Sequence, residues 1–410
     1  MKLSIKNIGK ISSADIELNS ITLIAGLNNT GKSTIGKILY CIFNGLYRID
    51  EKARSYLKRR ILKELETFSS PLFSLNTDSR IESVAEYLVT NRDKIKEISN
   101  IKEIVDKAKL DTLDEVNYES ILRFLKLSKD EIYNSVLQSF FEAEFYDQIE
   151  NFYAPENTSE LSLKISDKTV NAEINDEKIF IKNELFGLDC EAIYIDDPFV
   201  FDNYMYQRFY RRSNHKIDLY RKLTTVIKSN DELDMAVDNL MTSKRLEEIY
   251  RKINSVTPGS IKQNNRLAYF DKDFNKNIDF RNISTGLKSF IIIKTLLSNG
   301  YLSDKGVLIL DEPEVHLHPE WQKLFAEIIV LLQKEYNLHI LINSHSPYFI
   351  DAIDVYSEKY GIKDSCKYYL SREKSNKSIE VIDTTANLEP IYELLTSPLQ
   401  DLENERYSKN

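Results

Sequence analysis

The loop at residues 26–33 has the residue types and the spacing needed to hold a phosphate chain. It reads Gly-Leu-Asn-Asn-Thr-Gly-Lys-Ser and matches the pattern Gly-x-x-x-x-Gly-Lys-Ser/Thr at every fixed position. Gly26 and Gly31 let the backbone curl, so that successive N–H groups point inward at phosphate oxygens. Lys32 would reach the β- and γ-phosphates of ATP, and the Ser33 hydroxyl would bind Mg²⁺. The other predicted nucleotide contacts are Asn28, Asn29, Thr30 and Thr34.

Two carboxylates at the end of an apolar run form the second chemical feature. The run Val307–Leu310 leads directly into Asp311 and Glu312. In a parallel sheet, ligands bind at the carboxyl ends of the strands. Asp311 would hold Mg²⁺ through its water shell, and Glu312 would orient and polarise the attacking water. An acidic strand end that only faces solvent is the competing interpretation, and the presence of Lys32 and Ser33 in the same chain disfavours it.

Two further polar segments matter because of where they lie in the sequence. Ser284, Thr285 and Gly286 open an apolar helical segment, whose N-terminus is a second place where an anion can bind. Ordinary capping by Ser explains this stretch equally well when it is taken alone. His345 follows an apolar run at 338–344 and would face the γ-phosphate. Its alternative role is a satisfied turn histidine before a helix that begins at a proline.

Strands and helices must position these residues, and the polar–apolar pattern predicts most of them. Alternation predicts strands at 3–8 and 14–18, and an apolar run predicts a buried strand at 21–25, followed by the loop and a helix. The remaining predictions are a β-meander at 160–183, a strand at 191–196, helices from about 201 to 255, short strands within 266–283, a helix at 320–335, a strand at 338–344 and a polar tail. This pattern predicts an α/β fold with a mixed sheet flanked by helices.

The segment from about 51 to 155 differs from the rest because its predicted elements are charged helices. It shows no sustained heptad repeat, so a long coiled-coil arm is not indicated. We expect a mainly helical insertion subdomain at 51–159. The α/β domain would then be discontinuous, formed by 1–50 and 160–410.

The overall composition excludes several classes of protein. The chain has 410 residues, 42% of them hydrophobic, which favours a folded core over disorder. Its net charge of −9 gives no general attraction to nucleic acid or to an anionic membrane. Three scattered cysteines indicate neither a disulfide framework nor a cysteine-based zinc site. No apolar stretch reaches the length of a membrane span, and no signal peptide is evident, so we expect a cytoplasmic protein without a membrane partner.

One local basic segment, Tyr204–Lys222, is a candidate nucleic-acid surface. Its basic residues are interleaved with tyrosines, as in surfaces that follow a phosphate backbone and stack on bases. They are Arg208, Arg211, Arg212, Lys216, Arg221 and Lys222. An amphipathic helix whose aromatic side chains pack on the core is the alternative interpretation. A second basic run at 54–60 is interpreted as the solvated face of a helix.

Taken together, these motifs resemble the ABC-type ATPase heads of the RecF, SMC and OLD (overcoming lysogenization defect) group. The shared order is phosphate loop, insertion, signature, acidic strand and histidine switch. The run DEPEVHLHP from Asp311 to Pro319, followed by SHSP at 344–347, resembles the OLD-like bacterial branch that includes the AAA_21 and AAA_15 families. The resemblance covers residues 1–45 and about 265–355, and it implies a P-loop ABC-type head.

The resemblance also implies a dimer. Two heads would pair head to tail around ATP, so that Ser284, Thr285 and Gly286 of one subunit close on ATP held by Lys32 of the other. His345 would contact the γ-phosphate. The signature departs from the usual Ser-Gly-Gly pattern, because Thr285 stands where glycine is common. The loop after the acidic strand lies at the dimer seam in this group, and this implies an interface role for His316 and His318.

The chain resembles ATPase subunits of bacterial anti-phage systems of the Septu (PtuA) and PARIS types. OLD nucleases carry a Toprim domain after the head, and the 65 residues that follow His345 are too few for one. The resemblance therefore implies a separate effector nuclease of HNH or Toprim type, with DNA or a phage-derived molecule as the trigger. The alternative is a RecF- or SMC-like DNA maintenance ATPase that binds DNA directly. An ABC import ATPase is a third possibility, and neither the acidic strand nor the helical insertion resembles that class.

Overall fold

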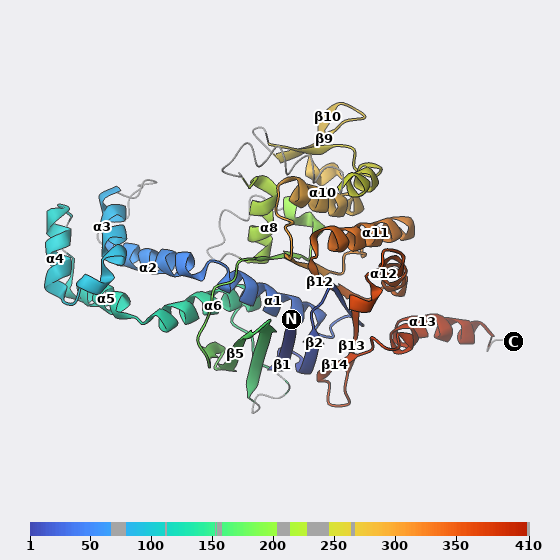
Figure 1. Ribbon diagram of the computed structural model, residues 1–410, viewed down its shortest axis with the longest axis horizontal. Coiled ribbons are helices and arrows are strands. Elements are labelled where there is room, and N and C mark those ends of the chain that lie inside the picture. Colours follow the sequence, from blue (N-terminus) through green and yellow to red (C-terminus); the bar gives the residue numbers. More distant parts are fainter. Residues whose placement is uncertain are drawn as a thin grey trace. The chain divides into compact units, whose positions relative to one another are not determined.

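The structure is a computed structural model of the 410-residue chain (Figure 1). The residues that it describes are 1–66, 79–110, 113–151, 153, 158–202, 214–227, 246–263 and 267–407. The chain divides into two compact units. The first contains 1–44, 140–183 and 190–410, and the second contains 45–139 and 184–189. The second unit thus begins six residues before the predicted insertion (51 against 45) and leaves 140–159 to the first unit.

An eleven-stranded mixed sheet forms the centre of the first unit. Its order is β6-β5-β4-β1-β2-β14-β13-β3-β12-β11-β7. The strands are β1 (Lys2–Ile8), β2 (Ile11–Glu17), β3 (Ile21–Gly26), β4 (Ser159–Ile165), β5 (Lys168–Asn175), β6 (Lys178–Ile181), β7 (Ala192–Ile195), β11 (Val307–Asp311), β12 (His339–Ser344), β13 (Lys367–Glu373) and β14 (Ile379–Asp383). The run β13-β3-β12-β11-β7 is parallel throughout, whereas β6-β5-β4-β1-β2 is antiparallel. This sheet and its flanking helices confirm the predicted α/β fold class.

Helices cover both faces of the parallel strands. On one face, Leu23, Leu308 and Ile342 belong to a core that also contains residues of α10 (Thr285–Ser298), α11 (Pro319–Tyr336) and α12 (Pro347–Lys359). On the other face lies α1 (Lys32–Leu46), where a Cβ added at Gly36 would come 3.0 Å from the side chain of Ile309. None of the helices among the described residues is long and apolar enough to cross a bilayer.

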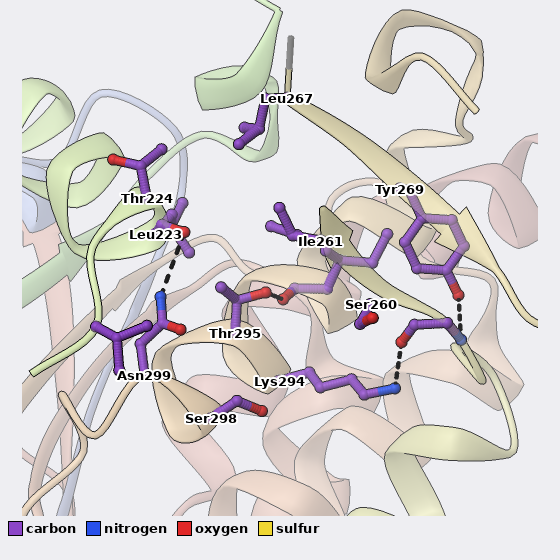
Figure 2. A pocket seen from close by; sticks show the side chains of 13 residues that line it. Leu223, Thr224, Ser260, Ile261, Leu267, Tyr269, Lys294, Thr295, Ser298 and Asn299 are labelled. Atoms are coloured by element: carbon purple, nitrogen blue, oxygen red, sulfur yellow. Dashed lines mark hydrogen bonds between the residues drawn. The ribbon is translucent and has the colours of Figure 1, made fainter. Parts of the chain in front are cut away.

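A small three-stranded sheet lies beside α10. Its strands are β8 (Ser260–Gln263), β9 (Leu267–Asp271) and β10 (Lys276–Ile278). β9 and β10 confirm the short strands predicted within 266–283, whereas β8 precedes that range. Figure 2 shows the pocket between β8, β9, α10 and the end of α8 (His215–Thr224). Lys294 donates to the carbonyls of Thr257 and Gly259, and burial lowers its pKa to about 8. We interpret Lys294 as a structural tie between α10 and the segment before β8.

The second unit is helical in its described residues. Its helices are α2 (Ile49–Glu66), α3 (Ser79–Thr90), α4 (Ile98–Lys107), α5 (Glu115–Lys126) and the first part of α6 (Lys129–Phe145). In α2 the buried residues recur every four positions at Ala53, Leu57 and Ile61, which is the spacing of one helix face. The remaining positions of α2 are mostly charged, and this one apolar stripe packs on α3 and α5.

The C-terminal segment contradicts the prediction of a polar tail. It forms α12, β13, β14 and α13 (Glu389–Tyr407), and β13 joins the centre of the sheet next to β3. Tyr368, Tyr369 and Leu370 are buried in β13 and supply its apolar content. Three apolar residues between Lys367 and Ser371 form a run too short to indicate a buried strand, and only the pairing with β3 shows that they are buried.

Candidate functional site

The loop between β3 and α1 adopts the strand–loop–helix arrangement that its sequence predicts. Gly26 ends β3, and α1 begins at Lys32. Asn29 and Gly31 have φ of 65° and 77°, a left-handed conformation that asparagine and glycine tolerate best. A Cβ at Gly31 would also lie 2.9 Å from the side chain of Ile11, so glycine is required there for two reasons.

The remaining loop residues have distinct positions. Asn28 and Asn29 are exposed, whereas Thr30 is buried and donates to the carbonyl of Leu27 at 2.8 Å. The carbonyl of Thr30 accepts a 2.6 Å bond from the Ser371 hydroxyl on β13, which ties the loop to the sheet. Ser33 is exposed on the first turn of α1, and the Thr34 amide donates to the Gly31 carbonyl at 3.1 Å. The Ser33 hydroxyl is therefore open to a ligand.

Lys32 points back into the loop. Its Nζ donates to the carbonyls of Gly26 at 3.0 Å and Leu27 at 2.8 Å, and only 4% of the residue is exposed. Burial lowers the pKa of Lys32, and the nearby carboxylate of Glu312, 3.6 Å away, opposes that shift. A buried cation at a helix N-terminus, with one carboxylate at ion-pair distance, is well placed to receive phosphate oxygens.

The parallel pairing of β3, β12 and β11 brings the predicted residues to one edge. Ser344 of β12 is in register with Ala25 of β3, and Asn343 is in register with Asp311 of β11. Strands that run in the same direction must end on the same side of the sheet, so their terminal side chains gather there. The structure therefore places the loop of Lys32 beside Asp311, Glu312 and His345, which are separated by about 280–310 residues in the chain but adjacent in space.

The Asp311 carboxylate is held on both of its oxygens. Asn343 Nδ2 donates to Oδ1 at 2.9 Å, and the Tyr194 hydroxyl donates to Oδ2 at 3.0 Å. Asn343 Nδ2 also lies 3.1 Å from the Lys32 carbonyl. Each carboxylate oxygen retains a second lone pair for a hard cation or its water shell. Asp311 and Ser33 would offer oxygen atoms as metal ligands, and Mg²⁺ prefers oxygen ligands.

Glu312 and His345 form the polar pair next to this carboxylate. Glu312 has φ of 49°, an uncommon conformation that turns the chain immediately after β11. Its Oε1 lies 3.3 Å from His345 Nδ1, an ion-pair distance that is long for a hydrogen bond. His345, and to a lesser extent Lys32, lower the pKa of Glu312, while Glu312 raises the pKa of His345. This favours a carboxylate that can polarise water beside a charged imidazole.

Glu314 is a site residue that the sequence analysis missed. Only 1% of it is exposed, and Oε1 accepts from the Ser344 hydroxyl at 2.6 Å and the His345 amide at 3.2 Å. Burial raises the pKa of Glu314. The side chain therefore joins the loop after β11 to the end of β12 and sets the position of His345. Glutamate in a polar loop carries no sequence signal of burial.

Two other residues, Tyr194 and Asn343, were also missed. Both lie within apolar strands, so their polar ends are not visible from periodicity. Tyr194 is in β7, which the pattern predicted as a strand at 191–196, and β7 pairs in parallel with β11. The sequence does not show which strand β7 pairs with. It therefore gives no reason to expect a hydrogen bond between Tyr194 and Asp311, which lie 117 residues apart.

The segment Ser284–Gly286 opens α10, as predicted, with Ser284 at the N-cap position. A Cβ at Gly286 would lie 2.8 Å from the His316 carbonyl and 3.2 Å from the Leu317 side chain. The signature therefore packs against the loop that follows β11. Among the described residues, no hydrogen bond or ion pair joins Ser284, Thr285 or Gly286 to the loop at 26–33.

His316 and His318, which the resemblance assigns to an interface, occupy the exposed loop between β11 and α11. His316 lies edge-on to Phe199, with ring centroids 5.7 Å apart. His318 caps α11, its Nδ1 accepting from the Glu320 amide at 3.4 Å. Within the part of the chain that the structure describes, no group of three or more His, Cys, Asp or Glu side chains is arranged to hold a metal ion.

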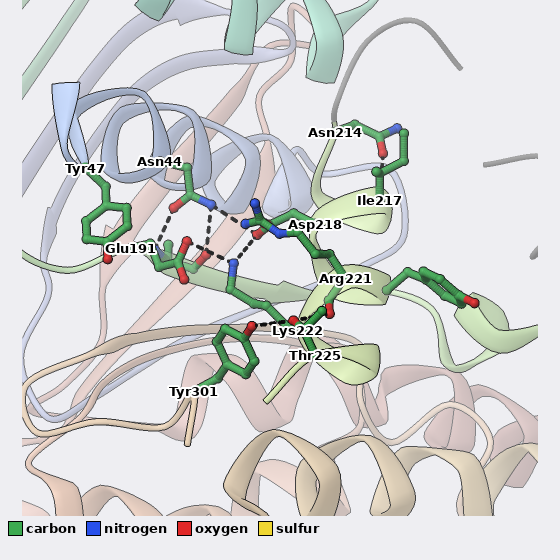
Figure 3. Close-up of polar contacts among 12 residues, drawn as sticks. Asn44, Tyr47, Glu191, Asn214, Ile217, Asp218, Arg221, Lys222, Thr225 and Tyr301 are labelled. Carbon is green, nitrogen blue, oxygen red and sulfur yellow. Dashed lines mark hydrogen bonds and ion pairs between the residues drawn. The ribbon is translucent and has the colours of Figure 1, made fainter. Parts of the chain in front are cut away.

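The described part of the basic segment, 214–222, is engaged in ion pairs. Lys222 is fully buried, and its Nζ contacts Asp218 and, at 3.0 Å, Glu191 (Figure 3). Arg221 pairs with Asp218 at 2.6 Å. Lys216 lies 3.3 Å from Asp196 and 3.4 Å from Asp197. Lys222 thus cannot contact a nucleic acid, and the two other cations already have carboxylate partners. Arg208, Arg211 and Arg212 lie outside the described residues.

Comparison with known proteins identifies relatives of this chain. The AAA ATPase domain family (AAA_15) matches residues 1–350. The endonuclease GajA of Bacillus cereus is 24% identical over 377 residues, which cover 81% of this chain and 52% of GajA. The OLD nuclease of Thermus scotoductus is 30% identical over 88 residues, covering 21% of this chain and 16% of that nuclease. The probable ATPase of retron Ec83 from Escherichia coli is 26% identical over 175 residues, covering 39% of this chain and 31% of that ATPase.

Solved structures also align with the chain. The SMC head domain of Thermotoga maritima covers 93% of this chain, which in turn covers 97% of that domain, with 11% identity and a TM-score of 0.41. The chain spans about half the length of GajA and smaller fractions of the other two relatives. The match to the AAA ATPase domain family, at residues 1–350, contains the loop of Lys32, the acidic strand and His345.

Proposed function

This chain belongs to the AAA ATPase domain family, and from that premise we propose that it binds and hydrolyses Mg²⁺-ATP in a bacterial anti-phage defence complex. The observation that supports this most directly is the convergence of Lys32, Asp311, Glu312 and His345 at one sheet edge. The loop around Lys32 and the N-terminus of α1 would hold the phosphates. Ser33 and Asp311 would hold Mg²⁺, which screens the phosphate charge during hydrolysis.

Glu312 is proposed to orient the attacking water. Its carboxylate lies 3.3 Å from His345 and 3.6 Å from Lys32, so it is close to the place where a γ-phosphate would sit. Glu312 raises the pKa of His345, which favours the positively charged imidazolium. In that form His345 would contact the γ-phosphate. If Glu312 has this role, Glu312→Gln should retain ATP binding and lose hydrolysis. Hydrolysis at the wild-type rate by this variant would refute the assignment.

A second copy of the chain is proposed to complete the site. The signature Ser284–Gly286 makes no hydrogen bond or ion pair with the loop of Lys32 in the described part of this chain. The resemblance to paired ATPase heads supports its supply to ATP by another subunit. Exposed apolar side chains flank the site, namely Leu27, Val315 and Tyr348, each close to half exposed. Such a surface suits a head-to-tail contact between two copies.

Mixing two inactive variants tests this arrangement. Lys32→Ala damages the phosphate loop, and Ser284→Arg places a bulky side chain at the signature. In a head-to-tail dimer, a mixed pair has both lesions in one site and an intact second site. Phosphate release should therefore reappear when the two inactive proteins are combined. If each site is complete within one chain, the mixture stays inactive, and the composite site is wrong.

The effector is proposed to be a separate nuclease of HNH or Toprim type. GajA is named an endonuclease, and it extends well beyond the part that this chain matches; the retron relative is named a probable ATPase. These names support an ATPase that controls nuclease chemistry supplied outside residues 1–410. ATP would act as a conformational ligand that favours one arrangement of the dimer and so holds or releases the effector.

Expression of the native gene cluster tests the proposed control. Cells that carry the whole cluster should resist phage, and Lys32→Ala in this chain should abolish resistance while the complex still assembles. Mass determination of the purified complex identifies the effector. A RecF-like role predicts instead that the purified chain alone binds DNA in an ATP-dependent and salt-sensitive manner. The ion pairs of Lys216, Arg221 and Lys222 favour the first outcome.

A further inference from the structure

The two hydrogen bonds to Asp311 come from residues outside every sequence motif. Asn343 and Tyr194 each donate to one oxygen, at 2.9 and 3.0 Å. A carboxylate that has a donor on each oxygen cannot rotate freely about its Cβ–Cγ bond. Its remaining lone pairs therefore point in fixed directions, which is the effect that outer-shell partners have on metal ligands.

Tyr194 is wedged between the acidic strand and α1. Its hydroxyl lies 3.5 Å from the Ser33 carbonyl as well as 3.0 Å from Asp311. A Cβ added at Gly36 would meet the phenol at 3.3 Å from Cζ and 3.4 Å from the hydroxyl. Glycine at 36 thus leaves room for this side chain, and the phenol sits between the two elements that carry the proposed Mg²⁺ ligands.

A buried histidine backs the phenol ring. His215 stacks on Tyr194 with ring centroids 4.4 Å apart and an interplanar angle of 27°. Its Nδ1 lies 2.7 Å from Glu144, and its Nε2 lies 3.0 Å from Asp196. Glu144 also accepts from the His215 amide at 2.6 Å. Glu144 of α6 and Asp196, the residue after β7, lie at ion-pair distance from the two ring nitrogens and restrict the plane of the imidazole. The phenol that stacks on it is restricted in the same way.

We propose that Tyr194 is a positioning residue for the metal ligand Asp311, and that His215, held between Glu144 and Asp196, keeps the Tyr194 ring in place. This inference rests on the proposed function, because it assumes that Asp311 serves Mg²⁺. It assigns a role to three segments that the motifs do not contain: β7, the start of α8 and the end of α6. A purely structural tyrosine would affect stability without affecting the response to Mg²⁺.

The test uses Tyr194→Phe in the full chain, which removes only the hydroxyl and keeps the ring that stacks on His215. The measurement is the equilibrium binding of a fluorescent ATP analogue, in EDTA and across a Mg²⁺ titration. The Mg²⁺ concentration for half-saturation should rise about tenfold, the lower end of the range for outer-shell variants. Affinity in EDTA should stay at the wild-type value. The hydroxyl meets the loop at 26–33 only at the Ser33 carbonyl, 3.5 Å away, and a carbonyl oxygen does not bind phosphate.

Tyr369→Phe is the matched control. Tyr369 is buried in the same sheet, on β13, and its hydroxyl accepts a 2.8 Å bond from the Glu17 amide. This variant should lose a buried hydrogen bond without changing the Mg²⁺ titration. An unchanged titration for Tyr194→Phe would overturn the inference, and so would an equal shift in both variants. Absence of any Mg²⁺-dependent binding by the wild type would instead overturn the proposed function, and the inference with it.

His215→Gln provides a second, independent variant. It leaves the Tyr194 hydroxyl in place and removes the ring that supports it. The half-saturating Mg²⁺ concentration should rise in the same direction as for Tyr194→Phe, by a smaller factor. If Tyr194→Phe does not fold, this variant carries the test alone, and a wild-type Mg²⁺ response in a folded His215→Gln protein would overturn the inference.

Discussion

Two regions of this molecule carry charged residues that look functional in the sequence, and they differ in what holds those charges. At the carboxyl ends of β3, β11 and β12, the polar side chains converge and remain accessible to a ligand. Ser33 is exposed, and Glu312 is one-third exposed. Along α8, the cations Lys216, Arg221 and Lys222 are paired with carboxylates, and Lys222 is fully buried. The first region is arranged to receive a ligand, whereas the second is largely satisfied within the chain.

The difference follows from how each region is built. Parallel strands deliver their last residues to one edge whatever those residues are, so charges there meet without neutralising one another completely. A helix instead presents its charges to whatever packs beside it, and here those partners are Asp196, Asp197 and Glu191. Asp218, on the same helix, pairs with Arg221 and Lys222. Basic residues on a helix therefore say little about an external ligand until their neighbours are known.

The largest expected effect is at the nucleotide edge. Lys32→Ala should abolish ATP binding, because two charge-assisted bonds to phosphate are worth about 4 kcal/mol, or about 1,000-fold in affinity. Isothermal titration with Mg²⁺-ATP measures this loss. Lys37→Ala, on the same helix, is the control and should bind normally. If Lys32→Ala still binds ATP with wild-type affinity, this edge of the sheet is not the nucleotide site, and the contrast with α8 is wrong.

The next effect is on stability, in the α8 region. Lys222→Met leaves Asp218 and Glu191 without their buried cation, and we expect unfolding to become easier by about 3–5 kcal/mol. Urea denaturation measures the change, with the exposed Lys323→Met as the control. ATP affinity of the folded variant should be unchanged. A stable Lys222→Met protein with weakened nucleic-acid binding would reverse our interpretation of this region.

A pH effect should follow from His215, which belongs to both regions. Glu144 and Asp196 overcome burial and raise the pKa of His215 to about 9. Because the folded pKa exceeds the unfolded value of about 6.5, the stabilisation is complete below pH 6.5 and disappears as the pH rises through about 9. This rise in the pKa of His215 corresponds to about 3 kcal/mol.

This effect is measured by denaturation at pH 6.5 and pH 9.5 in the wild type and in His215→Gln. The variant should lose much less stability over that interval. The comparison between the two proteins removes the contributions of other groups, including Lys294, whose pKa of about 8 changes stability in the opposite direction. Parallel pH profiles for both proteins would mean that folding does not raise the pKa of His215.

The smallest effect is expected at Arg221. Its side chain is largely exposed and pairs with Asp218, so Arg221→Gln should change the free energy of unfolding by no more than about 1 kcal/mol. If the chain binds DNA, the dependence of its affinity on salt should be the same in this variant. A phosphate contact by Arg221 would lower the slope of log affinity against log salt by about one.

Local patterns were sufficient to predict most elements on which the site depends. The strand at 21–25, the loop at 26–33 and the strand ending at Asp311 all lie where the sequence predicts them. The tail after His345 was predicted poorly, because the apolar part of β13 is only a few residues long. Its inclusion in the sheet depends on pairing with β3, some 345 residues earlier, and no local pattern records that partner.

By itself, the sequence determined which groups could bind phosphate and Mg²⁺, and it determined that Lys32, Asp311 and His345 stand at element ends. Only the tertiary structure decided what surrounds them: Tyr194 and Asn343 on the two oxygens of Asp311, Glu314 beneath His345, and carboxylates around Lys222. The physical reason is that these determinants act over different distances along the chain. Periodicity and turn chemistry act within a few residues, whereas burial and ion pairing depend on chain segments that meet only after folding.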